Sequence, residues 1–408
     1  MRILYIDHHA ALPSSGGDCR AVQLAQVWQQ VGDEVTVVTA GGGSHGEKVP
    51  LAQQDMWEQQ AEGVRLCRLA VPERSRGVGE HRKSVRSFLK KLYIHAPELA
   101  SRYQPEIVIA ASGYPYDFFC AQRVARLSRG KAVFELREPW AEQQREQYPG
   151  EENRLNNCIA EYAMGYALRG ADAVVSFLQK AEDYCRDKGR TPSRLVTLAV
   201  PAPPQAAPKP LKESDAAALA ALRKKYPVIA AYAGRLNDRR LPELLAGAAG
   251  SQQGEGVAAV IAGNGGYKQL LRRAVRENGW ENVLLLDGMS ERRQRTLYAA
   301  ADILYYGDDR QCDARYGSYA PLLLQMMQSG KPVLTATHGA VNAAAQAGCA
   351  VAAEPTQQSV REALRRFAAM EAGERAALGR QAEDALRTTH AVQRVAMDYR
   401  SALLRLWV

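Results

Sequence analysis

Residues 228–262 read VIAAYAGRLNDRRLPELLAGAAGSQQGEGVAAVIA, and this stretch carries the clearest fold signal in the chain. Apolar runs at 228–233 and 257–262 predict two buried strands, and the run 241–249 between them predicts a helix. Two strands joined by a helix in this way run parallel in one sheet. The alternation continues, with helices expected at 267–278, 291–300 and 321–329 and strands at 283–286, 303–306 and 332–335. We therefore expect a parallel sheet with helices on both faces.

The first half of the chain repeats this alternation. Residues 2–6 and 35–39 predict strands, and 20–31 predicts the helix that joins them. Further strands are expected at 107–111, 132–136 and 173–177. The first half is therefore expected to be a second α/β domain.

A proline-rich segment separates the two halves. Residues 201–210 read PAPPQAAPKP, which cannot continue a helix or a strand ladder. We expect one Rossmann-like domain over 1–200, a second over 201–385, and a helix over 386–408 that returns to the first domain. Ligands of open α/β sheets bind beyond the carboxyl ends of the strands, so the two domains are expected to face each other across a cleft.

Composition excludes some classes of protein. No segment approaches the roughly 20 apolar residues that span a bilayer, and the acidic residue and His pair at 7–9 come too early for a secretory signal. A cytoplasmic location is therefore expected. The seven cysteines form no Cys-x-x-Cys pair and have no histidine at zinc spacing, so neither a disulfide framework nor a metal site is predicted. The formal charge of +9 favours an acidic partner, either a nucleotide phosphate, an anionic membrane or a nucleic acid.

Basic residues gather between positions 65 and 91. The apolar residues Val85, Phe88, Leu89 and Leu92 recur there at helical spacing, which predicts an amphipathic helix with a basic flank. Two interpretations stand: a surface helix that packs on its own domain, or a patch that approaches anionic lipid headgroups. Nucleic-acid binding is disfavoured, because the stretch lacks the several aromatic residues that stack on bases. The basic residues are Arg65, Arg68, Arg74, Arg76, Arg82, Lys83, Arg86, Lys90 and Lys91.

Gly234-Arg235-Leu236 follows the first strand of the second half, and Arg240 lies five residues after Arg235. These residues resemble a loop of the family-four retaining glycosyltransferases, which use nucleotide-sugar donors. In that loop an arginine and a second cation, usually lysine, hold the donor's diphosphate. The turn 261–266, the helix-to-strand stretch 297–303 and the segment 325–333 are similar to further signatures of that family. The resemblance implies the GT-B fold, with the donor in the second domain and the acceptor in the first.

The resemblance also implies roles for individual residues. A departing diphosphate needs positive charge, which Arg235 and Arg240 would supply. Glycine turns and helix N-termini would bring backbone amides to the phosphates. Arg137 and Glu138 end a strand in the first half, where the alternative is a local salt bridge at the sheet edge. The predicted residues are Arg235, Arg240 and Glu138 for catalysis, Gly16, Gly17, Gly263, Gly317, Ser318, Tyr319 and Gln325 for the donor, and Ser112 and Arg137 on the acceptor side.

The chain departs from the family at its paired glutamates. Gln325 replaces the second of them, which binds the donor's ribose, and Gly317 stands at the first. An amide binds a ribose hydroxyl without charge assistance, at a cost of about 1 kcal/mol. Asp308, Asp309 and Asp313 are candidates to supply a carboxylate instead, or they belong to a solvated loop. Two hypotheses follow: an active transferase, which the retained cations favour, and a catalytically silent partner or regulatory subunit.

The resemblance sets the expected cofactors and partners. No Asp-x-Asp triplet occurs, so no metal cofactor is expected, and arginines and helix N-termini would take its place. The expected partners are a nucleotide sugar, a glycan or lipid-linked acceptor, and an anionic membrane surface, without nucleic acid. The setting that the resemblance implies is polysaccharide biosynthesis for the bacterial surface, by a cytoplasmic protein that is peripheral at the inner face of the cell membrane.

Overall fold

The chain forms two compact units in a computed structural model that describes residues 1–15, 17–41, 55–72, 78–237, 241–252, 254–339 and 342–407. Unit 1 contains Met1–Pro204, Tyr316–Tyr319 and Thr389–Val408, and unit 2 contains Gln205–Arg315 and Ala320–Thr388. The change of unit after Pro204 lies within the proline-rich segment. No feature of the sequence indicated that Tyr316–Tyr319 belongs with the first half.

Unit 1 is built on an eight-stranded sheet with the order β3-β4-β2-β1-β5-β6-β7-β8. Its central strands are buried on both faces, and Ile3, Leu4, Tyr5 and Ile6 of β1 are almost fully excluded from solvent, as expected for parallel strands covered by helices. The strands are β1 (Arg2–Ile6), β2 (Glu34–Ala40), β3 (Met56–Ala61), β4 (Val64–Leu69), β5 (Ile107–Ala110), β6 (Lys131–Leu136), β7 (Ala173–Ser176) and β8 (Leu195–Thr197).

The edge strand β3 is the exception to the parallel arrangement. It pairs antiparallel with β4 through a turn at Glu62 and Gly63, both of which have positive φ angles of 49° and 79°. A two-residue hairpin turn with positive φ at both positions matches the twist of its flanking strands. The first sheet is therefore parallel except at this edge, in a region where the sequence predicted no strands. Arg65 and Arg68 also belong to β4 rather than to the basic helix.

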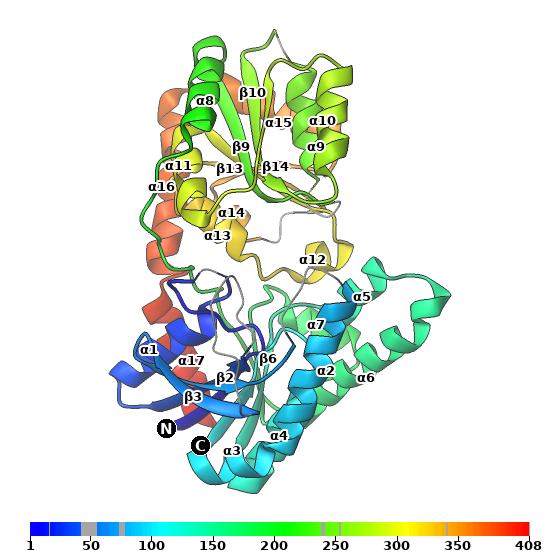
Figure 1. The fold of residues 1–408 in the computed structure, drawn as a ribbon, viewed down its shortest axis with the longest axis vertical. Helices are drawn as coiled ribbons and strands as arrows, with labels where there is room; N and C mark the ends of the chain where they lie inside the picture. Colours follow the sequence, from blue (N-terminus) through cyan, green and yellow to red (C-terminus); the bar gives the residue numbers. More distant parts are fainter. Residues whose placement is uncertain are drawn as a thin grey trace. The chain divides into compact units, whose positions relative to one another are not determined.

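The last helix of the chain packs on the first. Trp28 of α1 donates a hydrogen bond of 2.7 Å to the carbonyl oxygen of Ala396 in α17, and its ring meets Tyr399 edge to face. Figure 1 draws these two helices in blue and red. The return of the C-terminal helix to the first domain is confirmed. The helices of unit 1 are α1 (Arg20–Gln30), α2 (Val78–Ile94), α3 (Ala96–Tyr103), α4 (Asp117–Ser128), α5 (Trp140–Gln147), α6 (Arg154–Gly170), α7 (Ala181–Asp187) and α17 (Val392–Leu404), with short 3-10 turns η2 (Glu151–Asn153) and η4 (Arg405–Trp407).

Unit 2 is built on a fully parallel six-stranded sheet with the order β11-β10-β9-β12-β13-β14. This confirms the expectation from residues 228–262. The strands are β9 (Val228–Arg235), β10 (Val257–Asn264), β11 (Val283–Leu286), β12 (Ile303–Asp308), β13 (Val333–Thr337) and β14 (Ala350–Ala353). The helices are α8 (Glu213–Lys225), α9 (Pro242–Gly250), α10 (Lys268–Glu277), α11 (Glu291–Ala300), α12 (Gln311–Tyr316), α13 (Pro321–Met327), α14 (Ala343–Gln346), α15 (Gln357–Ala369) and α16 (Ala372–Thr388). In the part of the chain that the structure describes, no helix is both long and apolar enough to cross a bilayer.

Candidate functional site

Charged side chains gather where the central strands of unit 1 end. β1 is followed by Asp7, β5 by Ala111 and Ser112, and β6 by Arg137 and Glu138. These strands are parallel neighbours, so their carboxyl ends lie at one edge of the sheet, which is where ligands of open α/β sheets bind.

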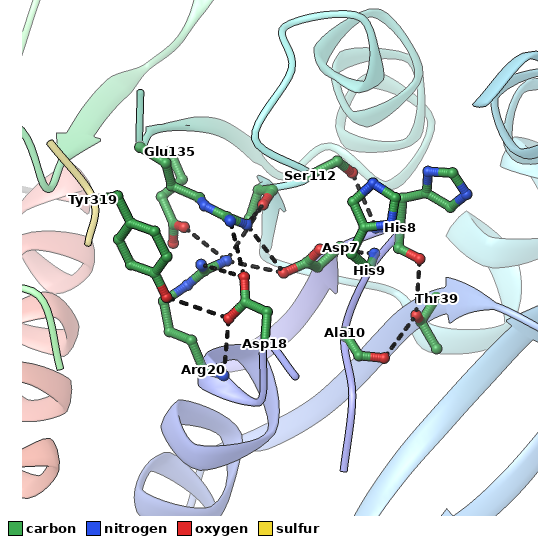
Figure 2. Close-up of polar contacts among 12 residues, drawn as sticks. Asp7, His8, His9, Ala10, Asp18, Arg20, Thr39, Ser112, Glu135 and Tyr319 are labelled. Atoms are coloured by element: carbon green, nitrogen blue, oxygen red, sulfur yellow. Dashed lines mark hydrogen bonds and ion pairs between the residues drawn. The ribbon is translucent and has the colours of Figure 1, made fainter. Parts of the chain in front are cut away.

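Arg20 of α1 is the centre of this cluster. Its guanidinium lies 2.9 Å from Asp7, 3.0 Å from Glu135 and 3.2 Å from Asp18, and only 1% of its side chain is exposed. Figure 2 shows the three carboxylates converging on it. Arg20 also donates to the hydroxyl of Tyr5, which in turn donates to Glu135. A buried guanidinium satisfied by several acceptors is strongly held in place.

Arg137 is the second cation of the cluster. Its guanidinium lies 2.9 Å from Asp18 and donates a hydrogen bond of 3.1 Å to the carbonyl oxygen of Ala111. It also lies over the ring of Tyr319, at 4.7 Å from the centroid, while the Tyr319 hydroxyl donates to Asp18. The alternative of a local Arg137–Glu138 salt bridge is therefore wrong, because Arg137 pairs with Asp18 and Asp7.

The cluster contains three carboxyl groups and two guanidinium groups. Burial raises the pKa of Asp7 to about 6 against the opposing effect of Arg20, and burial likewise raises the pKa of Glu135. Burial acts to raise the pKa of Asp18 as well, but Arg20 and Arg137 outweigh it and hold that pKa below its ordinary value. The two guanidinium groups are therefore neutralised by carboxyl groups within the cluster.

Ser112 and His8 form a neighbouring polar group at the same edge. Ser112 accepts a hydrogen bond of 3.1 Å from the amide of His8 and donates its own amide to Asp117. The imidazole of His8 is buried, contacts Ser84 and Tyr114 through its two nitrogens, and stacks on Phe88. Ser112, predicted on the acceptor side, thus has a clear packing role.

Asp117 is fully buried at the start of α4. Burial raises its pKa to about 7, although Ser112 donates to it, and one of its carboxyl oxygens has no hydrogen-bond partner.

The segment Tyr316–Tyr319 carries three of the predicted donor residues within unit 1. The amide of Ser318 donates to the side chain of Gln179 at 2.9 Å, so it is not available to a phosphate in this arrangement. Gly317 has a φ of +94°, and a Cβ atom there would lie 2.0 Å from the Gln179 side-chain oxygen. Glycine is therefore required at 317, the position where the resembling family has its first glutamate.

The carboxyl edge of the sheet in unit 2 is organised differently. Arg235 ends β9, and its side chain is exposed and makes no hydrogen bond or ion pair with another described residue. Gly263, the residue before the last of β10, lies beside Gly234 in the strand register, and Asn264 lies beside Arg235. A Cβ at Gly263 would lie 2.1 Å from the carbonyl oxygen of Gly234, and one at Gly265 would lie 2.0 Å from that of Leu236. The glycines therefore let the loop that carries Arg235 lie directly on the next turn.

A second cation lies at this edge. Lys268 begins α10, and its ammonium donates to Asn264 at 2.8 Å and pairs with Asp287 at 2.5 Å. The sequence prediction named Arg240 as the second cation, and that residue lies outside the described part of the chain, as does Gly16. The predicted Gly17 is described and exposed at the turn before α1.

The aspartates after β12 are mostly neutralised by their neighbour. Arg310 pairs with Asp308 at 3.2 Å and with Asp313, and both carboxylates are buried. Asp309 is exposed and pairs with His338. The interpretation as a solvated loop is thus wrong for Asp308 and Asp313.

Gln325 lies half-buried on α13, and no described residue hydrogen-bonds its side chain.

The structure groups the predicted site residues by unit. In unit 1 it brings Arg137, Tyr319 and Ser112 around Asp18 and Ala111, and in unit 2 it puts Arg235 next to Gly263. The sequence prediction missed Asp7, Asp18, Arg20, Glu135 and Lys268. A signal existed for Glu135, a carboxylate within the otherwise apolar run of a strand that is buried on both faces. Among the described residues, no group of three His, Cys, Asp or Glu side chains is arranged to hold a metal ion.

The two halves match two known domains. Residues 15–201 match the glycosyl transferase 4-like domain, and residues 218–385 match the domain of glycosyl transferases group 1. The chain is built from two glycosyltransferase domains. No curated protein sequence matches it.

Solved structures resemble the whole chain. Sucrose-phosphate synthase from Thermosynechococcus elongatus has a TM-score of 0.73 at 14% identity, and covers 100% of this chain and 99% of its own. HepE from Anabaena, solved with UDP and glucose, has a TM-score of 0.64 at 14% identity, with 99% of each chain covered. WaaG, a glycosyltransferase involved in lipopolysaccharide biosynthesis, has a TM-score of 0.65 at 16% identity, covering 98% of this chain and 99% of its own. The two glycosyltransferase domains thus have the GT-B fold, and the fold prediction is confirmed.

Proposed function

We propose that this protein transfers a sugar from a nucleoside-diphosphate sugar to a glycan or lipid-linked acceptor with retention of anomeric configuration. The observation that carries the proposal is the exposed Arg235, whose side chain pairs with no described residue, beside glycine turns in a domain that matches glycosyl transferases group 1. HepE, a neighbour of the same fold, has been solved with UDP-glucose.

In the proposed reaction, the bond between the anomeric carbon and the diphosphate oxygen breaks. The acceptor hydroxyl oxygen bonds to the same carbon, and its proton leaves with the diphosphate. Arg235 neutralises the negative charge that develops on the leaving group, together with Arg240. Lys268 of α10, which pairs with Asp287, lies at the same edge. This set of cations requires no metal ion, and Gln325 binds the ribose through its amide.

The edge of unit 1 is proposed to bind the acceptor. Arg137 is held rigidly by Asp18 and by the carbonyl of Ala111, so it presents a fixed donor rather than a mobile one. Glu138 follows it, is half-buried and does not pair with it. We assign Glu138 to the sugar and acceptor side of the reaction, and Ser112 to the positioning of that edge.

A second candidate function is a catalytically silent partner or regulatory subunit. It is favoured by Gly317, because the packing of Gln179 against this residue leaves no room for the family's first glutamate. Arg235 favours the transferase, since a silent partner gains nothing from an exposed cation on a tight glycine turn.

The test is a thermal-shift screen of the purified protein against UDP-, GDP-, ADP- and dTDP-sugars with a metal chelator present. A ligand that binds only the folded state raises the melting temperature. Donor hydrolysis or transfer is then followed by NMR, in which an unchanged anomeric configuration supports retention. A shift without turnover identifies the silent partner, and the absence of any shift at millimolar concentration contradicts nucleotide-sugar binding.

A further inference from the structure

Helix α6 of unit 1 is apolar on two opposite faces. One face packs into the domain through Ala160, Ala163, Met164, Ala167 and Leu168. The other exposes Leu155, Ile159 and Tyr162, which are 72%, 47% and 64% exposed. A helix that is apolar all round is usually buried on all sides. The outer face of α6 is therefore an exposed apolar surface of the kind that another molecule usually covers.

The exposed residues form one continuous stripe. Leu155, Ile159 and Tyr162 are four and three residues apart, so their side chains lie on the same side of the helix. Tyr162 stacks on Tyr166, which stacks in turn on Phe119 of α4 at 4.3 Å between ring centroids. Among the described helices, α6 is the one that exposes three large apolar side chains. Apolar residues exposed singly are normal, but a contiguous patch of this kind marks an interaction site.

Positive charge lies on α2, in the same unit as the stripe. Arg82 of α2 lies over the ring of Tyr148, and the carbonyl of Tyr148 accepts a hydrogen bond from Asn157 of α6. Tyr148 therefore contacts both helices, and it meets α6 at Asn157, on the side of the helix opposite Leu155. Arg82, Lys83, Arg86 and Lys90 are exposed on α2, whereas Lys91 is partly covered and pairs with Asp55. The two glutamates of η2 precede the stripe, which begins after them at Leu155.

We propose that α6 inserts its outer stripe into the interfacial layer of an anionic lipid bilayer while the cations of α2 bind the headgroups. Leucine and isoleucine side chains suit the acyl boundary, and tyrosine suits the interface because it has an apolar ring and a polar tip. Charge complementarity selects an anionic membrane over a second copy of this chain, since two copies would bring the cations of α2 together. Membrane attachment through the charge of α2 alone would depend fully on low salt. The stripe adds an apolar anchor to this attachment.

A native cysteine on the stripe can carry a fluorescent label. All seven cysteines lie in the described residues, and Cys158 is the one that is exposed. It lies three residues after Leu155, on the same side of α6. An environment-sensitive fluorophore attached to the native cysteine therefore reports directly on whether this face enters lipid.

The experiment measures partitioning of the full chain onto phosphatidylcholine vesicles with and without phosphatidylglycerol, in the absence of nucleotide. The α6 variant carries Leu155→Gln, Ile159→Gln and Tyr162→Gln, and the α2 variant carries Arg82→Gln, Lys83→Gln and Arg86→Gln. One matched control changes the singly exposed Leu270, Met397 and Leu404 to Gln, and the other changes the exposed Lys224, Lys225 and Arg387 of unit 2 to Gln. All these side chains are exposed, so the variants should fold.

We expect the α6 variant to bind anionic vesicles at least about tenfold more weakly, because it loses apolar area from the lipid contact. The α2 variant should lose about tenfold or more, together with most of its salt dependence, since it loses three of the cations that bind the anionic headgroups. Both controls should bind as the wild type does. The fluorophore on Cys158 should shift to the blue with anionic vesicles and be quenched by brominated lipid.

Three results would overturn the proposal. They are equal vesicle binding by the wild type and the α6 variant, no binding by either, and a wild-type dimer that the α6 variant dissociates, which would make the stripe a protein interface. Because no nucleotide is used, none of these results bears on sugar transfer, and failure of the thermal-shift screen does not bear on the stripe.

Discussion

The carboxyl edges of the two sheets hold their arginines in opposite ways. In unit 1, Arg20 and Arg137 are buried and paired with Asp7, Asp18 and Glu135. In unit 2, Arg235 is exposed beside turns lined with glycine, and no residue in the described part of the chain pairs with its side chain. A cation that already faces carboxylates has little charge left for a ligand, whereas an exposed one can neutralise a diphosphate. The comparison suggests that unit 1 uses its arginines as a framework and unit 2 uses its arginine for chemistry.

The largest effect is expected from removing the centre of the framework. Arg20→Met should lower the free energy of unfolding by about 3 to 5 kcal/mol, because it leaves the buried Glu135 without its cation and leaves Asp7 and Asp18 with Arg137 alone. The matched variant Arg235→Met should change it by less than about 0.5 kcal/mol, as is usual for surface substitutions. Urea unfolding followed by circular dichroism measures both. Equal stabilities of the two variants would remove the distinction between the edges.

The second prediction concerns pH and the buried Asp117. Its pKa of about 7 in the folded protein lies above the unfolded value of 3.8, so the native state holds a proton that the unfolded state releases. Stability contributed by the protonated form is full below the unfolded pKa and is lost as pH rises through 7. The loss approaches roughly 4 kcal/mol, since each pH unit of that window is worth about 1.4 kcal/mol.

Asp117→Asn cannot titrate, so its unfolding free energy should lack this fall between pH 4 and 7. The readout is the difference in slope between the variant and the wild type, because an asparagine also changes the hydrogen bonding at the site. Asp398→Asn, at a side chain 59% exposed, is the control and should follow the wild type. Parallel slopes for Asp117→Asn and the wild type would show that the carboxyl is ionised throughout.

The third prediction concerns turnover at the open edge. Arg235→Ala should lower kcat by about a hundredfold to a thousandfold, which corresponds to about 3 to 4 kcal/mol of lost charge stabilisation. Its melting temperature should stay close to that of the wild type, because no described residue depends on the side chain. Steady-state transfer assays and a melting curve on the same preparation make the test. A wild-type rate would remove Arg235 from the reaction.

The smallest effect is expected at Gln325. Restoring the family residue by Gln325→Glu should tighten donor binding by about 1 kcal/mol, since a charged acceptor strengthens the hydrogen bond to a ribose hydroxyl. The side chain is half-buried and has no described partner, so the substitution should not disturb the fold. Calorimetric titration with the donor gives the affinity. Weaker binding would mean that the ribose does not lie at α13.

The sequence predicted the fold well because local patterns determine its parts. The βαβ signal at 228–262 appears in the structure as β9, α9 and β10, and the strands end within two residues of the expected positions. The edge hairpin of β3 and β4 was missed, since half-exposed strands with many polar residues lack a continuous apolar run. The membership of Tyr316–Tyr319 in unit 1 was also not predictable, because it depends on contacts with Gln179 and Asp18 that are distant in sequence.

The candidate site was predicted less completely than the fold. Arg235 and Gly263 each belong to a short motif that is continuous in sequence, so the resemblance to the family-four glycosyltransferases pointed to them. The Arg20 cluster joins Asp7 and Arg20, near the start of the chain, to Glu135 of β6, which is over a hundred positions away, and no single segment reveals that their charges meet. Glu135 could have been noticed as a carboxylate inside an apolar run, but the sequence does not show that Arg20 is its partner.

The most direct test of the account is where a nucleotide binds. Isothermal titration of UDP should be carried out with the wild type, Arg235→Ala and Glu138→Ala, which change one edge each. We predict that UDP binds the wild type, that Arg235→Ala weakens it at least about tenfold through the lost charge-assisted contact, and that Glu138→Ala leaves it unchanged while lowering turnover. Unchanged UDP affinity in Arg235→Ala together with a loss in Glu138→Ala would contradict the assignment of the donor to the open edge of unit 2.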